Sequence, residues 1–263
     1  MLRKLLDSAH PLVFGHRGAA GLAPENTLPS FALALALGVD VLELDVHASS
    51  DGVIVVHHDD TLERTTDGTG LLRERTYEEL QELDAGYQFS RDGRDFPYRG
   101  HGLWIPTLEE VLYAFPDVAI NLEVKQGAPA IAAEVVRVIR EAGAADRVLL
   151  AAEKDAIIAE VRAVADGIPT SFATGEVVDF VNRMTTGDFA DYVPVGTALQ
   201  IPPRFGEIEL VTAESVAVAH GLGLEIHVWT INQRDEMDVL LALGIDGIMS
   251  DLPGLARRAV DEL

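Results

Sequence analysis

Short apolar runs alternate along the chain with segments in which apolar residues recur at helical spacing. The short runs favour β-strands, and the longer amphipathic segments favour helices. The expected strands cover residues 12–15, 39–46, 53–57, 118–124, 148–152, 170–173, 198–201, 225–231 and 247–250. The expected helices cover residues 28–37, 130–142, 157–165, 177–184, 213–220, 234–243 and 252–260. This alternation predicts an α/β protein.

Strands that are separated by helices pair in parallel, and helices then cover the sheet. About eight strand–helix units in about 260 residues fit a closed (β/α)₈ TIM barrel. An open doubly wound sheet is the alternative. No Gly-x-Gly-x-x-Gly pattern follows the first expected strand, and no Walker A pattern occurs anywhere, which disfavours that alternative.

One long segment, residues 64–106, interrupts the alternation. It contains Thr-Thr-Asp-Gly-Thr-Gly, a short helical pattern over 77–83 and a second glycine-rich stretch over 92–100. Because it is too long for a minimal loop, we expect an insertion after the second strand region of a single domain that spans 1–263. It is expected to lie over the barrel mouth, the alternative being a passive surface excursion.

Composition narrows the range of functions. The chain carries a formal charge of −23, which disfavours partners such as nucleic acid and anionic membranes. It has no cysteine, so thiolate zinc sites and disulfides are excluded. Residues 1–11 contain Arg3 and Lys4 but no apolar stretch long enough for a signal peptide, and no run approaches a membrane span. These features predict a cytoplasmic protein without stable membrane association.

Acidic side chains occur in two of the expected strands. Glu43 and Asp45 share one face of a strand, as do Glu123 and Lys125, because side chains at positions i and i+2 point the same way. Residues 39–46 are apolar on both parities, which indicates a strand buried on both faces rather than an exposed acidic one. Three carboxylates that meet at the carboxyl ends of barrel strands would repel one another. A hard divalent cation, Mg²⁺ or Ca²⁺, removes that repulsion.

Two histidines at strand ends are candidates for acid–base chemistry. His16 follows the first expected strand, and His58 follows the strand over 53–57. His57 competes with His58, since the run Val-Ile-Val-Val before them gives no clean parity that would select one. The alternative role for each histidine is structural.

Two cations and one aromatic residue complete the set of candidates. Arg17 offers forked donors to a phosphate oxygen, and Lys125 offers a point charge. A salt bridge to Glu25 or another carboxylate is the alternative role of Arg17, and the two roles can coexist. Trp229 ends an apolar run where it would contact the apolar part of a substrate or fill the core. Acid–base groups, hard-metal ligands and anion-binding cations are together what phosphoester cleavage requires.

With these residues the chain resembles the glycerophosphodiester phosphodiesterase family in its cytosolic bacterial form. The matching stretches, which contain the elements HRG, PENT, ELD and HD-x-x-L-x-RTT in order, are residues 15–70, 105–112, 121–125, 227–232 and 244–253. Ser250 stands where threonine is common, and the segment 84–104 is longer than in the shortest members. The longer segment bears on the preference for the alcohol headgroup.

The resemblance implies a TIM barrel that binds one divalent cation through Glu43, Asp45 and Glu123. It implies His16 as general base and His58 as general acid, selecting His58 over His57 through the pattern V-V-x-H-D. The expected reaction is hydrolysis of small-molecule glycerophosphodiesters to glycerol 3-phosphate and an alcohol.

Three other functions fit parts of the pattern. The first is a barrel phosphodiesterase that acts on lysophospholipids or phosphoinositides. The second is an amidohydrolase-like metallohydrolase, although the His-x-His such sites carry at the first strand is absent. The third is a non-catalytic barrel that binds a phospho-ligand.

Overall fold

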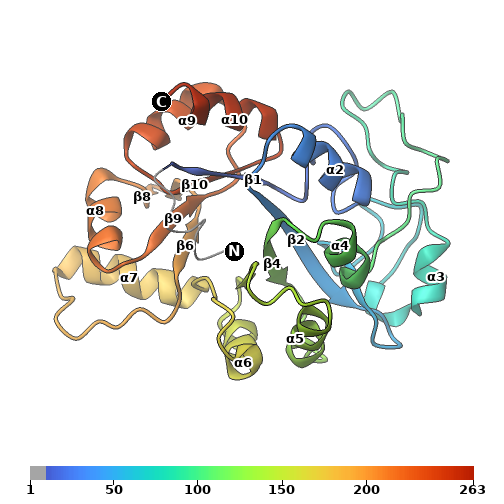
Figure 1. The fold of residues 1–263 in the computed structure, drawn as a ribbon, viewed down its shortest axis with the longest axis horizontal. Coiled ribbons are helices and arrows are strands. Elements are labelled where there is room, and N and C mark those ends of the chain that lie inside the picture. Colours follow the sequence, from blue (N-terminus) through green and yellow to red (C-terminus); the bar gives the residue numbers. More distant parts are fainter. Residues whose placement is uncertain (1–9) are drawn as a thin grey trace.

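A parallel sheet surrounded by helices forms the centre of the molecule (Figure 1). The computed structural model describes residues 10–263, so the N-terminal stretch considered for a signal peptide lies largely outside the described residues. The strands follow the order β5-β4-β2-β1-β10-β9-β6. Their bounds are β1 Leu12–Gly15, β2 Val41–Ala48, β4 Ala119–Val124, β5 Val148–Ala151, β6 Ala198–Ile201, β9 Glu225–Val228 and β10 Gly247–Ser250.

A very short strand-like segment joins the two edges of this sheet. Thr170 pairs in parallel with Leu150 of β5, and Ser171 pairs in parallel with Ala198 of β6. The Ser171 amide donates to the Leu150 carbonyl at 2.9 Å, and the Phe172 amide donates to the Ala198 carbonyl at 3.0 Å. The segment therefore fills the eighth strand position, and the predicted (β/α)₈ barrel is confirmed.

Helices cover the outside of the barrel (Figure 1). Their bounds are α2 Leu28–Ala36, α4 Leu108–Ala114, α5 Ala132–Glu141, α6 Asp155–Ala165, α7 Thr174–Thr186, α8 Ala213–Gly221, α9 Arg234–Ala242 and α10 Pro253–Asp261. The hydrophobic spacing did not predict α4, which is short and begins with a capping box between Thr107 and Glu110. Among the described residues, no helix combines the length and the apolar character that a membrane crossing needs.

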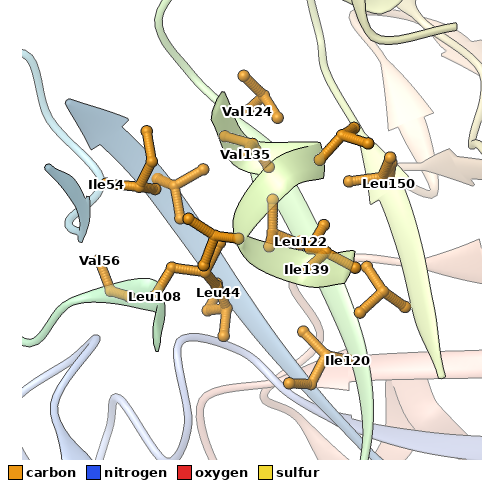
Figure 2. Close-up of a cluster of buried hydrophobic side chains, with 14 of the residues drawn as sticks. Leu44, Ile54, Val56, Leu108, Ile120, Leu122, Val124, Val135, Ile139 and Leu150 are labelled. Atoms are coloured by element: carbon orange, nitrogen blue, oxygen red, sulfur yellow. The ribbon is translucent and has the colours of Figure 1, made fainter. Parts of the chain in front are cut away.

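Apolar side chains fill both faces of the barrel strands. Leu44, Leu122 and Leu150 point outward and pack against Val135 and Ile139 of α5 (Figure 2). The opposite parity forms a separate interior cluster of Leu12, Phe14, Val41, Ala119, Leu149, Ala198 and Met249. Side chains two or four positions further along the same strands, on the interior parity, therefore also point into the barrel.

The segment expected as a strand over 53–57 differs from the other strands. It forms β3 (Ile54–Val56), which runs antiparallel to the end of β2 with His47 opposite Val55. It therefore extends one edge of β2 and is not itself a barrel strand. The run is apolar on both parities because Ile54 and Val56 pack in the main core cluster, whereas Val55 packs in a cluster with the insertion.

The insertion builds a small core of its own on β3. A 3₁₀ turn, Leu72–Glu74, and the helix α3, Tyr77–Gln81, follow β3. Apolar side chains of this segment form a cluster with the strand, comprising Val55, Leu62, Leu72, Leu80, Ala85 and Ile105. In Figure 1, α3 lies at the edge of the molecule beyond α2 and α4. A second excursion, the hairpin of β7 (Arg204–Phe205) and β8 (Ile208–Glu209), follows β6.

Candidate active site

Three carboxylates converge at the carboxyl ends of β2 and β4. Asp45 pairs in register with Glu123, and Glu43 lies two residues earlier on the same interior face as Asp45. Each of the three residues offers an oxygen, and these oxygens all lie within 4.8 Å of one another. Such a set of oxygen ligands suits a hard divalent cation.

The carboxylates strongly perturb one another. Burial, and then the neighbouring charge of Asp45, raises the pKa of Glu43 to about 7. Burial also raises the pKa of Glu123. Burial acts in the same direction on Asp45, but Lys125 and Arg17 outweigh it and hold the pKa of Asp45 below its ordinary value. Glu43 and Asp45 are thus two buried acidic groups whose pKa values shift in opposite directions. A bound cation would stabilise such a site.

Arg17 and Lys125 surround these carboxylates with positive charge. The Lys125 ammonium lies 2.8 Å from Glu123 and 3.2 Å from Asp45. The backbone amide of Arg17 donates to Glu43 at 2.8 Å, and the guanidinium Nη1 of Arg17 donates to Glu25 at 2.9 Å. The Nε atom of Arg17 is buried and has no hydrogen-bond acceptor among the described residues, although Asp45 Oδ2 lies at 3.4 Å. A buried donor that lacks a hydrogen-bond acceptor is suited to an anionic ligand.

His16 follows β1 and faces the same site. Its Nδ1 lies 2.7 Å from Oδ1 of Asp251, directly after β10. Burial alone would lower the pKa of His16, but the hydrogen bond to Asp251 and the charge of Glu43 raise it overall. Because Nδ1 contacts the carboxylate, the ring presents Nε2 for proton transfer.

The two adjacent histidines after β3 point in different directions. The His57 ring is buried, and its Nε2 contacts the carbonyl oxygen of Thr61 at 3.1 Å. Burial lowers the pKa of His57. His58 instead forms part of a cavity wall, and its Nδ1 lies 2.5 Å from Oδ1 of Asp59.

The cavity beside the carboxylates has a volume of about 330 Å³. Among the described residues, its lining consists of His47, His58, Asp59, Asp60, Glu123, Val124, Lys125, Glu153, Lys154 and Ile157. Trp229 does not line this cavity. It lies just after β9, 39% exposed, with its amide donating to the Ile201 carbonyl at 3.3 Å.

Several residues that contact the candidate groups, or the partners of those groups, were not predicted from the sequence. They orient the others through hydrogen bonds and comprise Asn26, Asp59, Arg64, Asn232 and Asp251, in addition to Glu25, whose salt bridge with Arg17 was expected and is present. All lie inside or beside stretches that carry the family resemblance, namely PENT, HD-x-x-L-x-RTT, HVWTIN and GIMSDLP. These motifs were the available signal, but their partners become visible only in three dimensions.

Comparison with known proteins agrees with this geometry. The model of the glycerophosphoryl diester phosphodiesterase family matches residues 16–255. A glycerophosphodiester phosphodiesterase of Caldanaerobacter subterraneus is 32% identical over 92% of this chain and 94% of its own length. A putative one of Bacillus subtilis is 33% identical, again over 92% of this chain and 94% of its own.

Solved structures agree as well. The glycerophosphoryl diester phosphodiesterase domain of an uncharacterized Mycobacterium tuberculosis protein has a TM-score of 0.85 at 26% identity, covering 95% of this chain and 98% of that one. A phosphodiesterase of Oleispira antarctica, solved with its product sn-glycerol-3-phosphate, has a TM-score of 0.80 at 28% identity, covering 97% and 99%. The chain therefore belongs to the glycerophosphoryl diester phosphodiesterase family and is a phosphodiester hydrolase.

Proposed function

We propose that the chain hydrolyses glycerophosphodiesters to glycerol 3-phosphate and an alcohol in a metal-dependent reaction, with His16 and His58 as the acid–base pair. The observation that carries the proposal is the set of three carboxylate oxygens within 4.8 Å, flanked by both histidine loops. The product bound to the Oleispira antarctica relative supports glycerol 3-phosphate as the common product.

The residues fit a resident divalent cation, Mg²⁺ or Ca²⁺. Glu43 and Asp45 are buried side by side, and burial, followed by repulsion from Asp45, raises the pKa of Glu43, a destabilisation that a cation would offset. Glu43, Asp45 and Glu123 would hold it. When bound, it supplies positive charge that stabilises a phosphate and the charge that develops on it.

Arg17 and Lys125 supply the protein's own charge for substrate binding. The buried Nε of Arg17, which donates no hydrogen bond to the described residues, is available to a phosphate oxygen. Lys125 is held in place by Asp45 and Glu123 and contributes a fixed point charge. Neutralising the phosphodiester in this way overcomes the long-range repulsion from a chain with a formal charge of −23.

The histidines divide the proton transfers. His16, whose basicity is increased by Asp251, takes the proton from the attacking hydroxyl, and His58 gives one to the leaving alcohol. Attack by the substrate's own glycerol 2-hydroxyl would give a cyclic phosphate that water then opens with the roles reversed. Attack by water would give the product directly, with the same first division of roles.

The first test is release of glycerol 3-phosphate from glycerophosphocholine and glycerophosphoethanolamine. We expect release that EDTA abolishes and that Mg²⁺ or Ca²⁺ restores. His16→Ala and His58→Ala should each lose turnover while remaining folded, whereas His101→Ala, at an exposed position of the insertion, should keep it. Turnover of lysophosphatidylcholine alone would favour the lysophospholipid alternative. The absence of any turnover, in protein shown to bind the cation, would favour a non-catalytic barrel.

A further inference from the structure

Arg64, the first residue of the insertion, contacts two carboxylates with a single guanidinium. Its Nε and Nη2 donate to Asp59 at 2.5 Å and 3.0 Å. Its Nη1 and Nη2 donate to the two oxygens of Glu25 at 2.6 Å and 2.8 Å. Both contacts are bidentate, and a bidentate contact fixes the plane of a carboxylate as well as its position.

Each of these carboxylates also contacts a residue of the candidate active site. Asp59 Oδ1 lies 2.5 Å from Nδ1 of His58, and Glu25 Oε1 accepts from Nη1 of Arg17 at 2.9 Å. The side chain of Glu25 is 17% exposed and that of Asp59 is 26% exposed. A continuous path of contacts therefore runs from Arg17 through Glu25, Arg64 and Asp59 to His58, linking the loop after β1 to the loop after β3.

A carboxylate bound on one side only is free to rotate about its side-chain torsions. Asp59 is adjacent to His58 in the chain, so their contact alone leaves the pair free to turn together. Arg64 restrains this pair against Glu25, which belongs to a different loop. Since proton transfer depends steeply on geometry, loss of this restraint would act on the chemical step.

We propose that Arg64 is a positioning residue that orients His58 through Asp59 and Arg17 through Glu25, so that the two loops act as one unit. The proposal rests on the acid–base role given above to His58. Lysine cannot replace Arg64, because one ammonium cannot form two bidentate contacts at the same time. Arg17 keeps its contacts to Glu43 and Asp45 without Arg64, so the larger effect falls on His58.

The kinetic test compares Arg64→Gln and Arg64→Lys with Arg73→Gln, which removes the same charge at an exposed position of the same insertion. We expect both Arg64 variants to lower kcat for glycerophosphocholine about 10- to 100-fold and to change KM less than about threefold. Arg73→Gln should match the wild type. Equal behaviour of Arg64→Gln and Arg73→Gln would overturn the proposal.

A double-mutant cycle separates positioning from general destabilisation. If Arg64 acts through Asp59, adding Arg64→Gln to Asp59→Asn should lower kcat by less than about threefold more. Full multiplication of the two single effects would show independent action and would contradict the proposed path. Thermal unfolding of each variant identifies any loss of kcat that comes from unfolded protein.

A spectroscopic readout tests the proposal without turnover. In ¹⁵N-histidine-labelled protein, we expect Arg64→Gln to shift the ring-nitrogen signals of His58, whereas Arg73→Gln leaves them unchanged. Unchanged His58 signals in Arg64→Gln would overturn the inference even if the wild type is active. A wild type that releases no glycerol 3-phosphate would instead overturn the proposed function, and the His58 signals would still decide the role of Arg64.

Discussion

The Nδ1 atom of His16 lies 2.7 Å from Oδ1 of Asp251, although 235 positions separate the two residues in the chain. The parallel pairing of β1 with β10 produces this contact. Gly15 lies opposite Ser250, so the residues that directly follow them, His16 and Asp251, lie side by side. Asn232 fixes Asp251 from the other side, donating to its Oδ2 at 2.6 Å and accepting from its amide at 2.9 Å. Only Oδ1 remains for the histidine, whose ring is thereby oriented.

Asp251→Asn should lower kcat about 100-fold, because an amide neither selects the ring tautomer nor stabilises the imidazolium. Burial lowers the pKa of His16 and Asp251 raises it, so removing the carboxylate lowers this pKa. A general base must be unprotonated, so the acid limb of the kcat profile should move to lower pH. Profiles between about pH 5 and pH 9 test this shift.

The matched control is Asp261→Asn, which removes an exposed carboxylate at the end of α10. It should leave both kcat and the acid limb in place. If Asp251→Asn lowers kcat while the acid limb stays where it is, the limb belongs to another group and His16 is not the base.

Cation binding should strengthen as the pH rises through about 7. Burial and the charge of Asp45 raise the pKa of Glu43 to about 7, so a proton must leave Glu43 before it binds a metal. Calorimetric titration of Mg²⁺ or Ca²⁺ at about pH 6.5, in two buffers of different ionisation enthalpy, should therefore show proton release. Bound cation should also stabilise the fold by about 2.7 kcal/mol at a hundred times its Kd.

Glu43→Gln should bind the cation more weakly and should lose this proton release, because the amide has no proton to give up. Glu109→Gln, at an exposed position near the start of α4, serves as the control and should behave as the wild type. Cation binding without proton release in the wild type would contradict Glu43 as the titrating ligand.

The carboxylate cluster was predictable because it depends on local geometry. The two-residue period of a strand puts Glu43 and Asp45 on one face, and the same period puts Glu123 beside Lys125. The alternation of strands and helices then predicts a barrel in which these faces meet. Their convergence within 4.8 Å follows from the neighbouring positions of β2 and β4, which the sequence alone did not establish.

Contacts between distant loops were not predictable. Nothing in the local pattern of Glu25 indicates that it pairs with Arg64, since the two are 39 positions apart. The apolar run before His57 and His58 did not show which histidine points into the site, because both faces of β3 are buried and their residues do not alternate between apolar and polar. The Thr61 carbonyl that accepts a hydrogen bond from His57 belongs to the turn just before the insertion, and the path of this turn depends on the core of the insertion.

Protonation of the buried His57 should make the stability of the fold depend on pH. Burial lowers the pKa of His57 below its ordinary value of 6.5, so below that pH the unfolded chain binds a proton that the folded chain excludes. The free energy of unfolding should therefore fall as the pH drops below 6.5, by up to about 1.4 kcal/mol per pH unit for this residue. His57→Gln should reduce that slope, measured by urea unfolding at several pH values.

Turnover provides the complementary measurement. His57→Gln keeps a donor for the Thr61 carbonyl and should hold kcat within about threefold of the wild type, whereas His58→Gln should lose nearly all turnover. His47, also buried with a lowered pKa, retains its share of the slope in both variants. A loss of turnover in folded His57→Gln equal to that in His58→Gln would reverse the assignment.

Gly18→Ala should destabilise the turn that carries His16 and Arg17. Gly18 has a φ of +87°, and a Cβ placed there would clash with Ser30 Oγ. That hydroxyl accepts from the Ala19 amide and donates to the Arg17 carbonyl, so displacing it breaks both hydrogen bonds.

Gly52 has the same φ but no atom within 4 Å of its Cβ position. We expect Gly52→Ala to cost about 1 kcal/mol of unfolding free energy and Gly18→Ala about 3 kcal/mol, in urea titrations of both variants. Equal costs would mean that backbone strain alone accounts for the glycine and that Ser30 does not hold the turn.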